Sequence, residues 1–498
     1  MRVAASTGTN VNSRIRQEEL GQFLTPSPVA EFMASMFSPF PETVRLLDAG
    51  AGAGALTLAL ITRLCVPGQG VRAIEATSYE IDPQILPRLS ATMEECRRLC
   101  EKAGIAFTCF LHHTDFIQDI TGRLSDDLFG NSPPAFDAAI ANPPYRKITA
   151  NSPERCALRR VGIETSNLYT GFIALIHRLL APGGQLVGIT PRSFCNGPYF
   201  RLFRQDFLKR MELRWIHVFE SRQAAFRDES VLQENIIFHA VRGKEQPAKM
   251  IVSSSSGEQG DVVSENRVPF FEVIHPNDPE SFIHIPSNAA HHEAKEMMEG
   301  LTASLSSLGI TVSTGRVVDF RLKDALHKEP SEGTVPLLYP CHFDGGIIRW
   351  PKAGSRKPNA IEDNEKTRAS LIPSGIYLLT KRFTSKEERR RVVACVLEPG
   401  LIDADWIGIE NHLNYFHSNR RGLERDVALG LYAYLNSTIV DQYFRRFSGH
   451  TQVNATDLRT LPYPDRETLE SIGCAMNKIN LPQDEIDHLV TAHLHACR

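Results

Sequence analysis

The sequence predicts an α/β protein of two domains, the first built on a mostly parallel sheet covered by helices. Short apolar runs alternate with helical stretches from about residue 44 to residue 240, which is the pattern of such a sheet. A glycine-rich turn follows the first apolar run, where ligands bind in this class of fold. The length of 498 residues also exceeds what one ordinary core holds.

The elements of the first half follow from runs of β-branched and aromatic residues separated by helical patterns. The predicted strands are Val44–Leu47, Ser78–Ile81, Ala106–Leu111, Phe136–Ala141, Gln185–Thr190, Leu213–Val218 and Asn235–Val241. The predicted helices include Leu56–Leu64, Leu86–Ala103 and Tyr169–Leu180. The last of these should end at Pro182-Gly183-Gly184, because proline and glycine close a helix.

The second half changes character after a polar, low-complexity stretch, Ser253–Asp261, which we expect to be a loop. Helical segments at His292–Ser306, Ser385–Glu398 and Val427–Phe447 are then separated by strands and loops rich in proline and glycine. We therefore divide the chain into residues 1–250 and 251–498, with the boundary somewhere between about 245 and 290.

Composition and charge limit the classes of function. Hydrophobic residues make up 42% of the chain and charged residues 23%, which is typical of a globular protein. The formal net charge of -3 excludes a uniformly basic nucleic-acid-binding protein, so any contact with a polyanion must come from local basic clusters. The chain has no CxxC pair, no apolar run near ~18 residues and no signal-peptide pattern. We expect a cytoplasmic protein without a metal site or membrane contact.

A glycine turn follows the first strand. Asp48 precedes Gly50, Gly52 and Gly54, whose alternate spacing permits a tight turn and brings backbone amides close to a ligand at a helix N-terminus. The spacing is neither that of a dinucleotide motif nor that of a phosphate loop ending in Lys-Ser/Thr. A turn without a ligand is the structural alternative, and Asp48 could equally cap the helix.

Two further acidic positions lie at the carboxyl ends of neighbouring strands. Glu80 closes the second strand, where a carboxylate can receive the hydroxyls of a ribose. Asp115 and Phe116 follow the third strand, where a carboxylate can accept from an adenine edge while the ring covers the face of the base. Asp115 is also a common turn residue. Together with the glycine turn, these positions predict a nucleoside ligand without an essential phosphate.

The fourth strand leads into Asn142-Pro143-Pro144-Tyr145. The prolines fix the backbone and remove donors, so that carbonyl groups and the Asn142 side chain can offer fixed acceptors to a planar amine. Holding both N–H bonds shifts electron density towards the nitrogen lone pair, which can then attack an electrophilic methyl group. Tyr145 offers a face on which an extruded base can stack. The structural alternative is a turn that ends a strand.

With these motifs in this order, the chain resembles S-adenosylmethionine-dependent N6-adenine DNA methyltransferases of the gamma class, which are paired with type II restriction enzymes. The resemblance covers nearly the whole chain. It implies a Rossmann-like S-adenosylmethionine-dependent methyltransferase domain, followed by a C-terminal mixed α/β target-recognition domain.

The resemblance also assigns roles. It implies that Thr25 and Pro26, in Gly21–Pro26, border the methionine end of S-adenosyl-L-methionine. The glycine turn with Asp48 matches the family's first motif, Glu80 its ribose acid, and Asp115-Phe116 its adenine-edge pair. In this family a later aromatic residue covers the flipped adenine opposite the tyrosine. Phe226 is the candidate by order, with Phe219 as its rival and an ordinary core phenylalanine as the alternative.

The amine of adenine is reachable only when the nucleotide leaves the stack, so a second domain must grip the duplex. Arg420-Arg421 and Arg445-Arg446 are candidate DNA contacts because they lie among aromatic, asparagine and histidine residues. A solvated surface is the alternative. Four segments of the second half resemble target-recognition domains of the PstI/BsuBI kind, which implies methylation of the adenine in CTGCAG. These segments are Gly315–Arg321, Asn411–Asn414, Ser448–Asn454 and Leu461–Pro464.

The sequence thus predicts an adenine-specific DNA methyltransferase that acts as a monomer on double-stranded DNA and protects it from a cognate restriction endonuclease. One alternative is a protein-glutamine N5-methyltransferase, which uses the same tetrapeptide on an amide nitrogen. Those enzymes carry their extra domain at the N-terminus, whereas the extra mass here is C-terminal. The other alternative is a non-catalytic DNA-specificity protein, which the intact Asn142 and glycine turn argue against.

Overall fold

The computed structural model describes residues 25–125, 135–219, 235–243, 245–255, 263–276, 278–285, 296–384, 390–402, 404–447, 452–476 and 478–496. The chain divides into two compact units, Met1–Ser287 and Asn288–Arg498. This division lies within the range of about 245 to 290 expected for it, although residue 250 itself falls inside strand β8 of the first unit. Among the described residues, no helix is long and apolar enough to cross a membrane.

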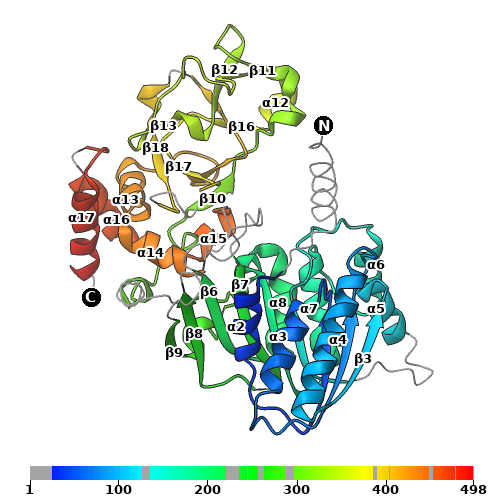
Figure 1. Ribbon diagram of the computed structural model, residues 1–498. Coiled ribbons are helices and arrows are strands. Elements are labelled where there is room, and N and C mark those ends of the chain that lie inside the picture. The colour runs from blue at the N-terminus through cyan, green and yellow to red at the C-terminus, as the bar shows by residue number, and fades with distance from the viewer. Residues whose placement is uncertain are drawn as a thin grey trace, which may run out of the picture. The chain divides into compact units, whose positions relative to one another are not determined.

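The first unit is an α/β unit (Figure 1). Its elements are α2 (Ser27–Ser35), β1 (Thr43–Ala49), α3 (Ala55–Leu64), β2 (Ala73–Tyr79), α4 (Leu86–Ala103), β3 (Ala106–His112), α5 (Phe116–Ser125), β4 (Phe136–Ala141), α6 (Pro153–Arg160), α7 (Leu168–Leu179), β5 (Leu180–Pro191), η2 (Arg192–Cys195), η3 (Pro198–Phe200), α8 (Arg201–Arg210), β6 (Met211–Phe219), β7 (Asn235–Arg242), β8 (Lys249–Ser255), β9 (Ser264–Pro269) and α10 (Phe270–Val273).

Nine strands of the described part form one sheet in the order β3-β2-β1-β4-β5-β7-β6-β8-β9. Strands β1 to β5 are parallel to one another, whereas β7 runs antiparallel to both β5 and β6. Apolar residues of α2, α3 and α4 pack on one face, and those of α5, α7 and α8 on the other. The predicted Rossmann-like methyltransferase fold is therefore confirmed for this unit.

Local sequence explains most of these boundaries. Helix α4 spans the predicted residues and ends at Gly104, whose φ of 69° suits a glycine that closes a helix. Strand β4 also has the predicted bounds. The second strand, expected at Ser78–Ile81, instead ends at Tyr79, and the chain leaves the sheet at Glu80. Residues Ser253–Ser255, expected in a loop, are buried in β8.

The second unit combines two sheets with helices (Figure 1). Its elements are β10 (Thr311–Thr314), η4 (Asp319–Arg321), η5 (Lys323–Ala325), β11 (Leu326–His327), β12 (Thr334–Leu338), η6 (Pro340–His342), β13 (Phe343–Asp344), β14 (Ile347–Ile348), β15 (Ala360–Glu362), α12 (Glu365–Arg368), β16 (Leu371–Pro373), β17 (Tyr377–Lys381), β18 (Ala394–Leu397), η7 (Pro399–Leu401), β19 (Trp406–Ile409), β20 (Leu413–His417), α13 (Arg425–Leu435), α14 (Thr438–Phe447), α15 (Ala455–Thr460), α16 (Arg466–Ala475) and α17 (Gln483–Ala496).

The sheets have the strand orders β10-β20-β17-β18-β14-β13 and β11-β15-β12-β19-β16. The unit is mixed α/β, as predicted. The helix expected at Ser385–Glu398 is wrong, because Ala394–Leu397 form a buried strand between β17 and β14. The helix expected at Val427–Phe447 is two helices, α13 and α14, separated at Asn436-Ser437. Of the helix expected at His292–Ser306, residues 296–299 are helical and 292–295 lie outside the described residues.

Candidate active site

The glycine turn connects β1 to α3 in the conformation that its sequence requires. Gly50, Gly52 and Gly54 have φ values of 81°, 54° and 86°, in the left-handed region that favours glycine. The amides of Gly50 and Ala51 donate to the Tyr79 carbonyl oxygen at 3.0 and 2.8 Å, which ties the turn to the end of β2. A Cβ on Gly54 would meet the side chains of Thr92 and Leu89 at 2.9 and 3.0 Å. Backbone angle and packing therefore both require glycine at this position.

Glu80 lies against this turn and is 2% exposed. One carboxylate oxygen accepts the amide of Gly52 at 2.8 Å, and the other accepts the amide of Asp82 at 2.7 Å. The structure thus brings the acid that follows β2 to the turn that follows β1. Both oxygens of this buried carboxylate therefore accept backbone amides that belong to the turn or to the segment after β2.

Asp48 is fully buried at the end of β1. Its Oδ2 accepts the Thr57 hydroxyl at 2.7 Å, whereas its Oδ1 has no hydrogen-bond partner among the described residues. Burial raises the pKa of this carboxyl to about 7, the hydrogen bond from Thr57 lowers it, and the charge of Glu80 adds to the increase. An unsatisfied buried acceptor beside a glycine turn fits a site whose ligand brings a donor.

Asp115 and Phe116 begin α5 at the same edge of the sheet. The Asp115 side chain accepts the amide of Gln118 at 2.9 Å, so it caps this helix, a local role akin to that of the turn residue named as the alternative. Phe116 is 2% exposed, and its ring lies 5.1 Å from the rings of Tyr79 and Phe172. Both residues therefore have structural roles as well as a position suited to a cofactor.

Asn142 follows β4 directly. The register Leu47↔Ala139 between β1 and β4 places Asn142 level with Gly50, so the tetrapeptide and the glycine turn share one edge. The Asn142 Nδ2 donates to the Thr25 hydroxyl at 3.0 Å, and its Oδ1 accepts the Tyr145 hydroxyl at 2.9 Å. Both ends of the amide are therefore held by side chains, which fixes the direction in which its oxygen points.

Pro143, Pro144 and Tyr145 complete the tetrapeptide. Pro143 is buried, whereas Pro144 and Tyr145 are partly exposed. The Tyr145 hydroxyl also lies 3.3 Å from the Ile189 carbonyl oxygen on β5. The ring of Tyr145 meets that of Tyr169 edge to face at 6.1 Å, and the Tyr169 hydroxyl lies 3.1 Å from the Ser193 hydroxyl. Contacts with neighbouring side chains and with β5 thus fix the position of Tyr145.

Sequence reasoning did not identify Thr57 or Tyr169 as parts of this site. Their signals were weak, because each falls inside a helical pattern, where a polar or aromatic residue has ordinary explanations. Thr25 was identified by resemblance, and the structure adds its contact with Asn142. Pro26 is the residue before α2. Phe226 lies outside the described residues, whereas its rival Phe219 is buried at the end of β6, 5.0 Å from the His217 ring.

The candidate DNA contacts belong to the second unit. Arg420 and Arg421 are exposed in the turn between β20 and α13. Arg445, on α14, is ion-paired with Asp441 at 2.7 Å, and its side chain is 26% exposed. Arg446 is on the same helix, and its side chain lies outside the described part of the structure. The structure therefore leaves Arg420-Arg421 better placed for an external anion than Arg445.

Comparisons with known proteins identify the chain's relatives. The family described as Eco57I restriction-modification methylase matches residues 79–226. The type II methyltransferase M.PstI from Providencia stuartii is 43% identical over 96% of this chain and 93% of its own length. M.BsuBI from Bacillus subtilis is 46% identical over 95% of this chain and 93% of its own length. Among solved structures, a DrdV–DNA complex is similar with a TM-score of 0.49 and 12% identity, over 93% of this chain and 58% of that one.

The fold, the glycine turn and the tetrapeptide define a methyltransferase of the kind found in restriction–modification systems. The chain belongs to the family of type II methyltransferases that includes M.PstI and M.BsuBI. It is a site-specific DNA methyltransferase. Neither a protein-glutamine methyltransferase nor a non-catalytic specificity protein is favoured, because the similarity to type II methyltransferases extends over almost the full length of both chains.

Proposed function

We propose that this enzyme methylates N6 of an adenine that has been flipped out of duplex DNA, and that Asn142, Pro143, Pro144 and Tyr145 form its catalytic site. The observation that carries this proposal is the Asn142 amide, held by Thr25 on one side and Tyr145 on the other beside the glycine turn. A fixed acceptor next to a nucleoside cradle suits an amine that must be held while it reacts.

The cofactor we propose is S-adenosyl-L-methionine, which supplies an electrophilic methyl group. Gly50, Gly52 and Gly54 would present the backbone, and Glu80, which lies against this turn, would accept from the ribose hydroxyls. The Asp48 Oδ1, buried without a partner in the described part of the chain, supports a donor-bearing ligand at this place. By the resemblance to its family, Thr25 and Pro26 would border the methionine end of this cofactor, and Asp115 and Phe116 its adenine.

In this proposal the protein's own groups prepare the target amine. The Asn142 Oδ1, whose direction is held by the Tyr145 hydroxyl, would accept one N–H of the adenine amine. The backbone carbonyl of Pro143 would accept the second N–H. The ring of Pro144, the next residue, restricts the backbone at this point and so fixes the direction of that carbonyl. The Tyr145 ring would cover one face of the base, and Phe226 the other.

We assign target recognition to the second unit. Arg420 and Arg421, with Arg445 and Arg446 as a second cluster, would contact the duplex. The identity of 43% and 46% with M.PstI and M.BsuBI supports CTGCAG as the methylated sequence. We propose that one copy of the chain carries out each transfer, since the first unit holds all the catalytic candidates; light scattering of the enzyme on its duplex would test this.

Transfer of a labelled methyl group from S-adenosyl-L-methionine to duplex DNA tests the function directly. We expect transfer by the wild type, none by Asn142→Ala, and unchanged transfer by Asn151→Ala, which alters an exposed asparagine nine positions further on. Single-molecule sequencing of DNA from cells that express the enzyme should show N6-methyladenine in CTGCAG. Methylation of cytosine alone, or full activity of Asn142→Ala, would contradict the proposed chemistry.

A further inference from the structure

A pocket of about 650 Å³ in the second unit is lined by four arginines and no carboxylate. It lies where β16 and β19 of one sheet approach the end of β20 of the other. Its remaining lining residues are apolar or neutral and include Trp406, Tyr415 and Asn419. Four cations around one concave space repel each other unless an anion or a counter-charge accompanies them.

The arginines differ in their partners. Arg368 is ion-paired with Asp363 at 3.1 Å, and its guanidinium lies over the Trp406 ring at 4.4 Å. Arg316 donates to the Ala369 carbonyl oxygen at 3.2 Å, which holds its guanidinium at the pocket. Across the described residues, no carboxylate lies within ion-pair distance of Arg316, Arg420 or Arg421. Three cations in this pocket are therefore not neutralised.

The turn that carries two of them is built with some strain. Asn419 and Arg420 have φ values of 48° and 63°, and Ser418 and Arg421 close the turn with hydrogen bonds of 3.0 and 2.8 Å. Asparagine tolerates the left-handed region, but an arginine there is uncommon and strained. Glycine would relieve this strain but would remove the cation.

Buried His417 supports the same turn. Its Nδ1 accepts the Arg420 amide at 3.1 Å, and its Nε2 lies 2.9 Å from the Ser313 hydroxyl on β10. Burial lowers the pKa of His417, and the charges of Arg316 and Arg420 lower it further, so the ring is neutral near pH 7 and can keep accepting from Arg420. The two arginines are thus presented from a rigid support.

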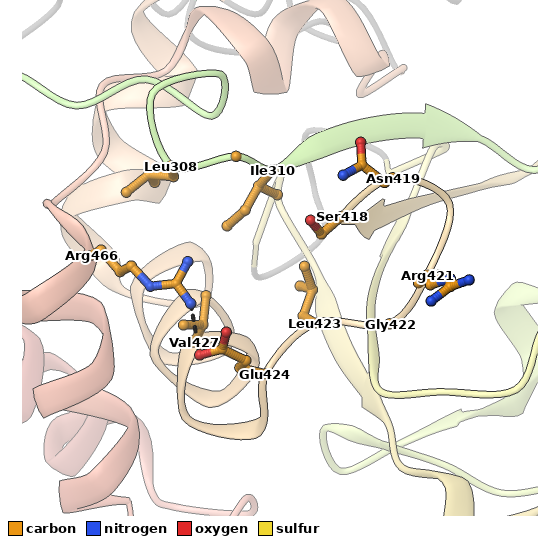
Figure 2. A pocket seen from close by; sticks show the side chains of 11 residues that line it. Leu308, Ile310, Ser418, Asn419, Arg421, Gly422, Leu423, Glu424, Val427 and Arg466 are labelled. Atoms are coloured by element: carbon orange, nitrogen blue, oxygen red, sulfur yellow. Dashed lines mark ion pairs between the residues drawn. The ribbon is translucent and has the colours of Figure 1, made fainter.

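In a neighbouring pocket of this unit, by contrast, an arginine is neutralised by a carboxylate. Figure 2 shows Arg466 paired with Glu424, and both residues line that pocket. Their charged groups are 2.7 Å apart. The Arg421 guanidinium lies on the other side of the turn, away from this ion pair (Figure 2). Arg421 lines both pockets, whereas Arg316 and Arg420 line only the arginine pocket, so all three unpaired cations meet there.

We propose that the arginine pocket binds the phosphate backbone of the DNA substrate, with Arg316, Arg420 and Arg421 as its phosphate contacts. This inference rests on the proposed function. It adds Arg316 to the DNA contacts, and it assigns the contacts in this pocket to phosphate. Phosphate fits better than a base edge, because three separate cations around an open pocket match several anionic oxygens along a strand. A base edge is read by one bidentate side chain.

The salt dependence of DNA binding tests this assignment with the full-length enzyme. Fluorescence anisotropy would give affinities for a duplex containing CTGCAG and for an unrelated duplex across a range of KCl concentrations. Replacing Arg316, Arg420 and Arg421 together by alanine should reduce the slope of log affinity against log salt by about 0.9 for each phosphate that the protein no longer neutralises. Both duplexes should lose affinity equally. Replacing all three by lysine should keep most of the slope, because a phosphate accepts a point charge.

Arg425→Ala is the matched control, since Arg425 lies four positions from Arg421 but is ion-paired with Glu398 at 2.9 Å. It should leave the slope unchanged. An unaltered slope in the triple alanine variant would overturn the proposal, as would a loss confined to the CTGCAG duplex, which would mean base reading. Methyl transfer by the same wild-type preparation separates the two claims. If the wild type transfers methyl groups but the triple alanine variant keeps the wild-type salt slope, only the role of the pocket is refuted. If the wild type neither transfers methyl groups nor binds DNA, both claims are refuted.

Discussion

At the scale of single residues, the site depends on contacts between segments that are far apart in the chain. Thr25 and Asn142 are separated by 117 positions, yet their side chains are 3.0 Å apart. The sequence could predict Asn142 from the tetrapeptide and its place after a strand. It could not predict that a threonine hydroxyl fixes the amide, because such pairing depends on how α2 packs on the sheet.

The first prediction concerns Thr25 as a positioning residue. Thr25→Val keeps the shape but removes the hydroxyl that receives the Asn142 Nδ2, so the amide can rotate away from its productive direction. Loss of one such hydrogen bond is worth about 1 kcal/mol or slightly more, and we expect kcat to fall about tenfold. Thr25→Ser should restore most of the rate. A weaker cofactor affinity with unchanged kcat would show that Thr25 acts on the cofactor alone.

The second prediction follows from the raised pKa of Asp48, about 7 in the folded protein against about 3.9 in an unfolded chain. Between these values the folded state binds more protons than the unfolded state, so the contribution of Asp48 to stability is present at low pH and is lost as pH rises towards 7. The free energy of unfolding of the wild type should therefore fall relative to that of Asp48→Asn from pH 4.5 to 7.5.

The difference can change by at most roughly 1.4 kcal/mol for each pH unit. Urea unfolding of both proteins at several pH values would measure it. A cationic ligand near Asp48 favours the ionised carboxylate, so binding of S-adenosyl-L-methionine near pH 6.5 should release protons in the wild type and fewer in Asp48→Asn. A pH-independent difference in stability would mean that Asp48 is ionised throughout.

At the scale of elements, two glycines allow α13 and α16 to pack closely. A Cβ on Gly430 would overlap the carbonyl oxygen of Leu469, and a Cβ on Gly473 would overlap that of Asp426. Each helix therefore supplies a glycine where the backbone of the other approaches. This reciprocal contact joins two helices of the second unit's main core.

The third prediction tests this contact. Gly430→Ala improves helix propensity but forces the two helices apart, so we expect a net loss of stability of about 3 kcal/mol. Gly122→Ala, on α5, is the control, because nothing lies within 4 Å of the added Cβ. It should stabilise the protein by about 0.5–1 kcal/mol. Thermal unfolding followed by calorimetry would measure both, and equal effects of the two substitutions would contradict the packing argument.

Elements were predicted well where periodicity and caps agreed and poorly where tertiary contacts decided. Helix α4 has a clear pattern and a closing glycine, and its bounds were correct. The segment containing Ala394–Leu397 follows charged residues that resemble a helix, but its place between two strands makes it a strand. Ser253 and Ser255 resemble a loop in sequence. They are buried in β8 because both hydroxyls bond to the His217 ring, a contact invisible in the local sequence.

At the scale of the whole molecule, the chain consists of two units with separate hydrophobic cores. The clusters around Phe172 and Leu60 lie in the first unit, and those around Leu431 and Leu379 in the second. The composition break indicated two domains with a boundary between about 245 and 290, and the units divide within that range, at Ser287–Asn288. It did not give the exact position, because the polar residues after Val252 continue β8, which lies between β6 and β9 in the sheet. Under our proposal, the first unit carries out methyl transfer and the second unit contacts the DNA.

The fourth prediction is that ligands and substitutions act on one unit at a time. Calorimetry of the full chain should resolve two transitions, because each unit has its own core. S-adenosyl-L-methionine at about 100 times its Kd adds about 2.7 kcal/mol to the unit that binds it. For a unit of this size, that should raise one transition by about 4 °C. Gly430→Ala should lower only the other transition. If both perturbations moved the same transition, the cofactor site and the α13–α16 core would belong to one cooperative unit. Stability measurements would then give no support for assigning methyl transfer and DNA binding to separate units.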